Sequence, residues 1–227
     1  MYAARMSALT PHSREWYAAL AARTGGYVHP WRQTLAGPSG EALFDALLEP
    51  LLTPDTRVLE AGCGHGVDAA RFAPRVAHWT GYDFTPASLV RAQRDVPGAT
   101  FVEWDSSSAP IPAGLRGPFD LIVSRRGPTS VIPHLRTLAA PGARVLGVHA
   151  GGEAVAARIA GRLALAGLEV ATGWSVRVRG HLPTFQDARL HTEFNGGTLT
   201  EAEWAARVTA DGLPFMEERY VWLARLP

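Results

Sequence analysis

The sequence predicts an α/β fold, a doubly wound and mostly parallel sheet with helices on its faces. Two observations lead to this prediction. Short apolar runs that suit buried strands alternate with amphipathic stretches that suit helices over much of the chain. One of these runs, residues 57–59, passes through a glycine-rich turn into a helix expected over 67–72, which Pro74 closes.

Two helices are expected before that run. The first covers 14 to about 23, with Ser13 as its cap and a glycine pair at 25–26 as its end. An aromatic loop over 27–32 follows, and the second helix runs from about 38 to Pro50. These N-terminal helices either contribute to an active site or only cover the sheet, and the sequence leaves both interpretations open.

After the glycine-rich turn, apolar runs indicate further strands over residues 76–82, 99–104, 119–124, 143–149, 168–178 and 219–226. Helices are expected over 85–94, over 153–166 and, behind a capping box at Thr200, to about 209. Because no repeat or linker interrupts the chain, we predict a single domain over 1–227. It comprises a helical cap (1–55), a core (56–178) and a C-terminal part (179–227), with an insertion over 179–214 before the last strand.

Composition restricts the function. The chain has 22 basic and 21 acidic residues, so it carries no strong field that would attract nucleic acid or an acidic membrane. All the basic residues are arginine, which excludes a lysine base or Schiff base. Cys63 is the only cysteine, which fits a reducing compartment, and metal-binding spacings of Cys and His are missing. With no signal-peptide pattern and no apolar span, we expect a cytoplasmic protein without metal, nucleic acid or membrane as partner; its oligomeric state is open.

The glycine-rich turn is the most informative motif. Glu60 precedes Gly62, Gly64 and Gly66 in the sequence Glu-Ala-Gly-Cys-Gly-His-Gly. A strand, a glycine turn and a helix direct backbone N–H groups toward a ligand, and Glu60 is placed to accept from a cationic amino group. A dinucleotide-binding fingerprint is the alternative, but it needs a small residue where Val67 stands.

This motif resembles the first motif of class I S-adenosylmethionine-dependent methyltransferases. The resemblance implies that the methionine part of S-adenosylmethionine lies against the glycine turn. It covers about 40–178 and the last strand, and it implies a seven-stranded sheet with an antiparallel final hairpin.

Acids at the ends of the next two strands strengthen the resemblance. Asp83 stands 23 positions after Glu60, close to the spacing expected of an acid that binds ribose hydroxyls. In the family, an acid at the position of Asp105 lies beside the adenine amino group. Phe84 flanks the adenine or belongs to the core. The predicted cofactor-binding residues are Glu60, Gly62, Cys63, Gly64, Gly66, Asp83, Phe84, Asp105, Ser106 and Ser124.

The acceptor is expected over the ends of the fourth and fifth strands, which carry Ser124, Arg125, Arg126 and His149. The family's Asn/Asp-Pro-Pro-Tyr/Phe motif for amine methylation is absent. Paired arginines favour an anionic acceptor, and ion pairs within the domain are the alternative. We name His149 and Arg126 as catalytic candidates; a hydrogen-bonded structural histidine is the alternative for His149.

Three aromatic residues of the 27–32 loop, Tyr27, His29 and Trp31, are expected to wall the acceptor pocket or to plug the core between the N-terminal helices. Together these features predict an S-adenosylmethionine-dependent methyltransferase with a small, anionic acceptor. An RNA or protein methyltransferase, a non-catalytic S-adenosylmethionine-binding protein and a nicotinamide-dependent oxidoreductase are the alternatives.

Overall fold

The computed structural model describes residue 10 and residues 13–108, 110–115 and 117–227. The chain divides into two compact units. The larger comprises residues 39–176 and 218–227, and the smaller comprises residues up to 38 together with 177–217. The first nine residues of the predicted helical cap lie outside the described part.

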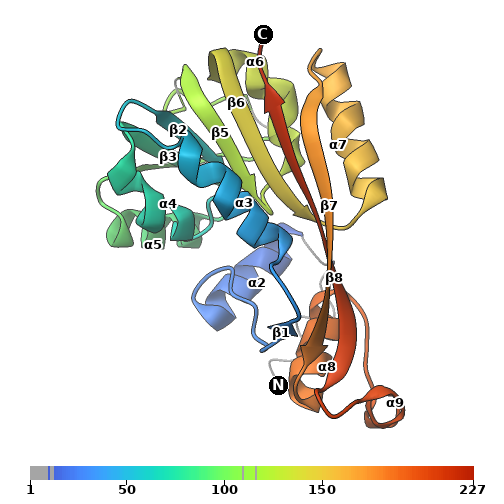
Figure 1. Cartoon of the computed structure of the whole chain (residues 1–227). Helices are drawn as coiled ribbons and strands as arrows, with labels where there is room; N and C mark the ends of the chain where they lie inside the picture. The colour runs from blue at the N-terminus through green and yellow to red at the C-terminus, as the bar shows by residue number, and fades with distance from the viewer. Residues whose placement is uncertain (1–9, 11–12, 109, 116) are drawn as a thin grey trace. The chain divides into compact units, whose positions relative to one another are not determined.

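The sheet order is β1-β7-β8-β6-β5-β2-β3-β4 (Figure 1). The bounds are β1 (Thr34–Leu35), β2 (Arg57–Ala61), β3 (His78–Asp83), β4 (Thr100–Glu103), β5 (Phe119–Arg125), β6 (Ala139–Ala150), β7 (Val170–Leu182) and β8 (Leu213–Arg225). The described residues thus form eight strands, and the predicted count of seven was wrong. The extra strand, β1, pairs antiparallel with β7. It has two residues, too few to show an alternating pattern in the sequence.

The sheet is mostly parallel, as predicted. β2 pairs in parallel with β3 and β5, and β4 and β6 extend this arrangement outward. β8 pairs antiparallel with β6, which agrees with an antiparallel last strand. Because β2, β3, β4, β5 and β6 run in the same direction, their carboxyl ends meet at one edge of the sheet. All the cofactor-binding candidates were predicted for this edge.

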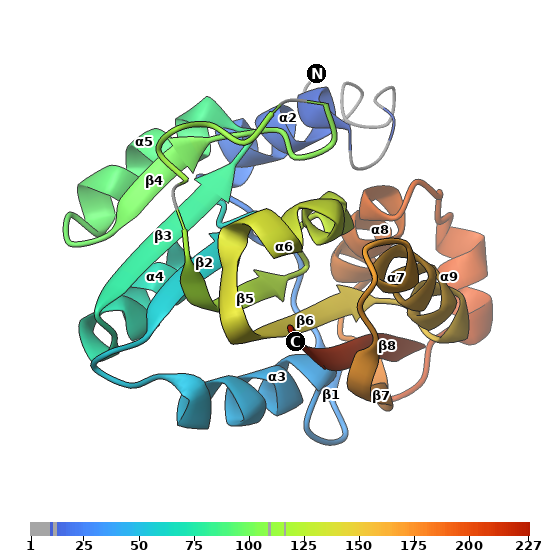
Figure 2. The same ribbon diagram turned by 90° about the horizontal axis from the view of Figure 1, so that it is seen from above.

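Helices cover both faces of the larger unit's sheet (Figure 2). α3 (Gly40–Leu48) and α4 (Val67–Phe72) pack on one face through Phe44, Leu48 and Phe72. η3 (Thr129–His134), α6 (Leu135–Leu138) and α7 (Glu153–Leu165) pack on the other. α5 (Pro86–Asp95) lies against β3 and β4, and two short turns, η1 (Glu49–Leu51) and η2 (Ala73–Arg75), follow α3 and α4. The predicted helices over 67–72, 85–94 and 153–166 are confirmed within a residue or two.

The smaller unit contains α2 (Arg14–Thr24), α8 (Phe185–Phe194) and α9 (Glu201–Arg207). Ser13 caps α2 and the capping box starts α9, both as predicted. The helix α8 and the extension of β7 to Leu182 were not predicted, and β8 begins six residues before the expected start. None of the helices that the structure describes combines the length and apolar character of a membrane-spanning helix.

Candidate functional site

The glycine turn after β2 adopts the left-handed backbone conformation that its glycines allow. Gly62, Gly64 and Gly66 have φ of 72°, 53° and 81°, a region that favours glycine. The backbone N–H groups of Gly62 and Cys63 both donate to the Tyr82 carbonyl at 2.9 Å, which fixes the turn beside β3. A Cβ at Gly62 would lie 2.6 Å from Pro128 Cδ, whereas a Cβ at Gly64 would meet no atom within 4 Å. The turn is therefore packed at its base and open at Gly64.

Asp83 ends β3 beside this turn. Its Oδ2 accepts from the Gly64 N–H at 3.0 Å, and its Oδ1 accepts from the Thr85 N–H at 2.8 Å. Burial raises the pKa of Asp83, and these backbone hydrogen bonds oppose the rise. The carboxylate thus holds the open position of the glycine turn and the start of α5 at once. Phe84, which follows it, is half-buried.

Asp105 and Ser106 follow β4 at the same edge. Asp105 Oδ1 accepts from the Ser107 N–H at 3.0 Å, an Asx turn of the kind its sequence favours. Ser106 is buried; its Oγ accepts from the Tyr82 hydroxyl at 3.3 Å and lies 2.7 Å from the Ser130 Oγ. The Ser106 hydroxyl therefore connects β3 with η3. A contact of either residue with the cofactor stays a prediction.

Glu60 has a partner that the sequence did not reveal. Its Oε2 accepts from the indole Nε1–H of Trp79 at 2.9 Å, and the side chain is 5% exposed. Burial raises the pKa of Glu60 well above its usual value, and the nearby Asp68 carboxylate raises it further. As a strand residue, Glu60 shares the face of Val58, which packs toward α3 and α4. Its predicted contact with an amino group stays a prediction.

Cys63 is buried against β3, where its Cβ and Sγ lie 2.8 and 2.9 Å from the position that a Gly81 Cβ would take. Burial raises the pKa of the Cys63 thiol well above its usual value, so the thiol is neutral. Its side chain packs the turn, which leaves the backbone as the part available to a ligand.

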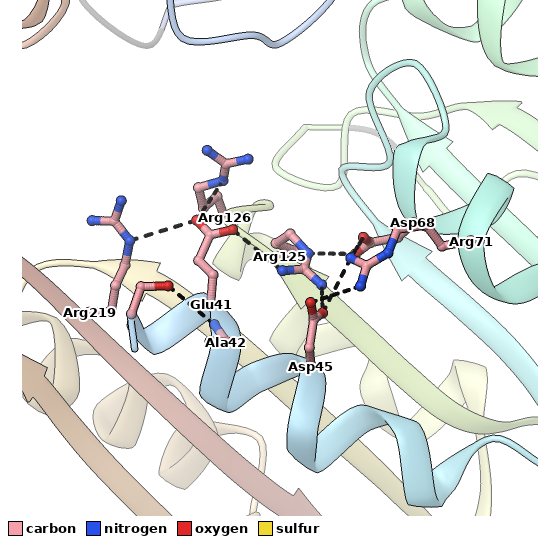
Figure 3. Close-up of polar contacts among 9 residues, drawn as sticks. Glu41, Ala42, Asp45, Asp68, Arg71, Arg125, Arg126 and Arg219 are labelled. Carbon is pink, nitrogen blue, oxygen red and sulfur yellow. Dashed lines mark hydrogen bonds and ion pairs between the residues drawn. The ribbon is translucent and has the colours of Figure 1, made fainter. Parts of the chain in front are cut away.

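Arg125 belongs to a network of ion pairs with carboxylates from α3 and α4 (Figure 3). Its Nε donates to Asp68 Oδ2 at 2.7 Å, its Nη2 donates to Asp45, and its Nη1 lies 3.4 Å from Glu41 Oε2. The guanidinium also lies over the Phe44 ring, 4.5 Å from the centroid. Burial acts to lower the pKa of Arg125, but Asp68 and Asp45 raise it above its usual value. The structure thus favours the ion-pair interpretation of Arg125 over acceptor binding.

Arg126 is different, because it has a positive φ of 57° in a residue other than glycine. Its backbone N–H donates to the Val148 carbonyl at 2.8 Å, and its Nε lies 3.2 Å from Glu41 Oε1. Arg219 of β8 approaches the same oxygen with its Nε, at 3.7 Å. Figure 3 shows the terminal nitrogens of both guanidinium groups directed away from Glu41. Glu41 therefore orients two arginines that lie far apart in the sequence, Arg126 after the end of β5 and Arg219 in β8.

Two polar candidates lie on the opposite face of the sheet. Ser124 and His149 are 2% and 6% exposed, and Ser124 Oγ and His149 Nε2 have no hydrogen-bond partner among the described residues. Burial lowers the pKa of His149 to about 4, and Arg158 on α7 contributes to the shift. His149 is therefore neutral at physiological pH. Both interpretations of His149 that the sequence allows, a general base and a hydrogen-bonded structural histidine, stay predictions.

The aromatic candidates Tyr27, His29 and Trp31 lie in the smaller unit and contact one another. His29 stacks on Trp31 with ring centroids 4.4 Å apart, and Trp31 meets Phe194 of α8 edge to face at 4.9 Å. Tyr27 lies 5.8 Å from His29. These contacts build a core cluster within the smaller unit. Their role toward an acceptor stays a prediction.

The residues that sequence reasoning missed are Glu41, Asp45, Asp68, Trp79 and Arg219. Glu41 and Asp45 stand four apart on α3, so they share one helix face, and this spacing was the only local signal. Arg219 reaches Glu41 from the end of the chain, a pairing that no local pattern indicates.

The fold and the site define a class of protein. It is an α/β domain of the nucleotide-binding type, in which a glycine turn flanked by acidic residues lies at the carboxyl edge of the sheet. A family model described as a methyltransferase domain matches residues 58–149. These residues, 92 of the 227 in the chain (149 minus 58 plus 1), are the part that is similar to methyltransferase domains.

Individual proteins and solved structures are similar to this chain. An uncharacterized methyltransferase of Synechocystis is 35% identical over 135 residues, which are 56% of this chain and 60% of the relative. A functionally unknown protein from Deinococcus radiodurans R1 has a crystal structure that is 47% identical, with a TM-score of 0.84 over 94% of this chain and 100% of that one. A TehB-like SAM-dependent methyltransferase from Corynebacterium glutamicum shares the fold, at 16% identity and a TM-score of 0.54 over 81% and 87% of the two chains.

The residues at the edge fit an S-adenosylmethionine molecule. A side chain at Gly64 would occupy the open side of the turn, which is where backbone must come close to a ligand. Asp83 offers carboxylate oxygens at the end of the neighbouring strand, in register with the end of β4. The contacts of these residues with the cofactor stay a prediction.

Proposed function

We propose that this protein binds S-adenosylmethionine and transfers its methyl group to a small, anionic acceptor. The observation that carries the proposal is the hydrogen bond between Asp83 and Gly64, at the open position of the glycine turn. It joins the acid expected to bind ribose to the turn expected to hold the methionine part. Calorimetry with S-adenosylmethionine and S-adenosylhomocysteine tests the binding, and no heat at millimolar cofactor would refute it.

S-adenosylmethionine supplies a methyl group on a sulfonium, which is a good leaving group. The protein's contribution is then mainly to hold the acceptor in line with the methyl. Asp83 and the glycine turn hold the cofactor side. Arg126, the better placed of the two predicted arginines, orients the acceptor, and His149 receives a proton from an acceptor that carries one.

The anionic acceptor is supported by the pair of Arg126 and Arg219. Both lie against one carboxylate oxygen of Glu41, which fixes the direction of their terminal nitrogens. Guanidinium groups held in this way suit a carboxylate or phosphate. The left-handed backbone of Arg126 is a conformation that costs about 1–3 kcal/mol, which is typical of functional positions.

This gives a specific expectation for Arg126→Met. Cofactor affinity should stay within about threefold, because the cofactor contacts belong to other strands. Turnover of an anionic acceptor, from a panel of small carboxylates and phosphates, should fall at least tenfold, and Arg126→Lys should restore only part of it. If Arg126→Met and the parent protein turned over the acceptor equally fast, the proposed role of Arg126 in acceptor binding would be refuted.

The remaining expectations are part of the same proposal: the partner is a small molecule, and nucleic acid and membrane are not partners. A cytoplasmic location is supported by Cys63 as the only cysteine.

A further inference from the structure

Three polar atoms without partners lie together on one face of the larger unit's sheet. They are Ser124 Oγ on β5, His149 Nε2 on β6 and Trp222 Nε1 on β8. Each belongs to a buried residue, and none has a hydrogen-bond partner among the residues that the structure describes. Buried polar groups are nearly always hydrogen-bonded, so three exceptions in neighbouring strands need an explanation.

Strand register brings the three together. Ser124 is paired with Gly147 of β6, and Gly147 is paired with Trp222 of β8, so the three stand in one row across the sheet. A Cβ at Gly147 would overlap the Nε1–Cε2 edge of the Trp222 indole. The indole N–H therefore lies over Gly147, about one strand spacing, or ~4.8 Å, from the strand of Ser124.

His149 completes the group from the next outward position of β6. It is two residues beyond Gly147, so it points to the same face. Its ring lies nearly parallel to the Trp222 indole, at 14°, with centroids 6.3 Å apart. β5 and β6 end one residue after Ser124 and His149, at Arg125 and Ala150. The row thus lies just inside the carboxyl edge at which the acceptor is proposed to bind.

The hydrogen-bonding capacity of the three side chains indicates which chemical group they can bind. Trp222 can only donate, Ser124 can donate and accept, and a neutral His149 offers Nε2 as either, depending on the tautomer. An ammonium group would find no acceptor at Trp222. A carboxylate would be buried beside three uncharged groups, and Arg158, the cation that acts on His149, is itself exposed, so burial of the carboxylate would be costly. A neutral group that accepts one hydrogen bond and donates another suits all three, and a hydroxyl has this property.

We propose that Ser124, His149 and Trp222 form a binding site for a hydroxyl group of the methyl acceptor. The hydroxyl oxygen accepts from the Trp222 Nε1–H, and the hydroxyl proton is donated to His149 Nε2 or Ser124 Oγ. This inference rests on the proposed methyl transfer, and it assigns Ser124, which the sequence placed at the cofactor, to the acceptor. Burial of the three side chains shields such a hydroxyl from water.

The test observes the Trp222 indole N–H by NMR in the full-length ¹⁵N-labelled protein, with the signal assigned by its loss in Trp222→Phe. Methanol and phenol are titrated with and without S-adenosylhomocysteine, and toluene serves as the matched compound without a hydroxyl. We expect a saturable shift of the Trp222 signal with a hydroxyl probe, none with toluene, and at least tenfold weaker binding in the double variant Ser124→Ala/His149→Leu. No saturable shift with either probe, or the same shift with toluene, would overturn the proposal.

S-adenosylhomocysteine itself separates this inference from the proposed function. Shifts of the Gly62–Gly66 amides report cofactor binding in the same spectra. Cofactor binding without a response of Trp222 to the hydroxyl probes refutes the hydroxyl site alone. If the cofactor causes no amide shift, the proposed function fails instead, and the titrations without cofactor still decide the hydroxyl site.

Stability provides an independent readout. Trp79 and Trp222 are both 1% exposed, but the Trp79 N–H is hydrogen-bonded to Glu60 and the Trp222 N–H has no described partner. Trp79→Phe removes a hydrogen bond together with packing, whereas Trp222→Phe removes packing only. We expect a smaller loss of melting temperature for Trp222→Phe.

Discussion

Replacement of Arg125 by methionine tests the ion-pair network in which the structure places it. Methionine keeps apolar contact with the Phe44 ring but leaves Asp68 without its closest cation. Asp68 is 3% exposed and Arg125 is 12% exposed, so the pair is removed from a largely buried environment. Loss of one partner of a buried pair costs about 3–5 kcal/mol, because the other charge stays buried. We expect the free energy of unfolding to fall by this amount.

Urea unfolding at pH 7 measures this change, and Arg71→Met is the matched control. Arg71 contacts the same two acids, at 2.8 Å from Asp45 and 3.6 Å from Asp68, but it is 44% exposed. An exposed pair contributes at most about 1 kcal/mol, so Arg71→Met should have a small effect. Arg125→Lys should recover part of the loss, because it restores the charge without the fork of donors.

The outcome separates two roles for Arg125. A stability of Arg125→Met within 1 kcal/mol of the parent would refute the network argument. If that variant were stable and bound cofactor normally but failed to turn over an anionic acceptor, the result would favour a role of Arg125 in acceptor binding.

Two further predictions concern the cofactor site and His149. Asp83→Ala should weaken cofactor binding at least tenfold in calorimetry, because hydrogen bonds to a carboxylate contribute about 1.5–3 kcal/mol; unchanged affinity would mean that the ribose site lies elsewhere. The pKa of His149 is lowered from 6.5 to about 4, so the unfolded chain binds a proton in this window before the folded protein does. The parent should therefore lose roughly 3 kcal/mol of stability as pH falls from 6.5 to 4, and His149→Leu should lack this loss in denaturant titrations. Parallel pH profiles for the two proteins would contradict the lowered pKa.

Local sequence was sufficient to predict the backbone geometry of much of the proposed cofactor site. The glycines of the turn act through their backbone conformation, and Asp83 acts through its place at the end of a strand. Both properties depend on a few neighbouring residues, so a short stretch of sequence predicts them. The helix caps at Ser13 and Thr200 were predictable for the same reason. The two-residue strand β1 was not, because it exists only through its pairing with β7.

The assignment of the arginines needed the tertiary structure. Arg125 and Arg126 are neighbours in the sequence, which predicted acceptor binding for both and a catalytic role in addition for Arg126. The strand directs Arg125 toward the acids of α3 and α4, whereas the backbone turns left-handed at Arg126. Glu41 then forms ion pairs with both Arg126 and Arg219, and Arg219 stands 93 positions further along the chain (219 minus 126).

The sequence by itself thus determined the fold class, the glycine motif and the edge of the sheet where we propose that the cofactor binds, since these depend on periodicity and on short-range backbone geometry. Only the tertiary structure decided which polar groups find partners. The indole N–H of Trp79 donates a hydrogen bond to Glu60. The strand register places Trp222 over Gly147, beside Ser124 and His149. Hydrogen bonds and ion pairs between distant segments depend on the register and face of each strand, and these are fixed when the whole sheet packs.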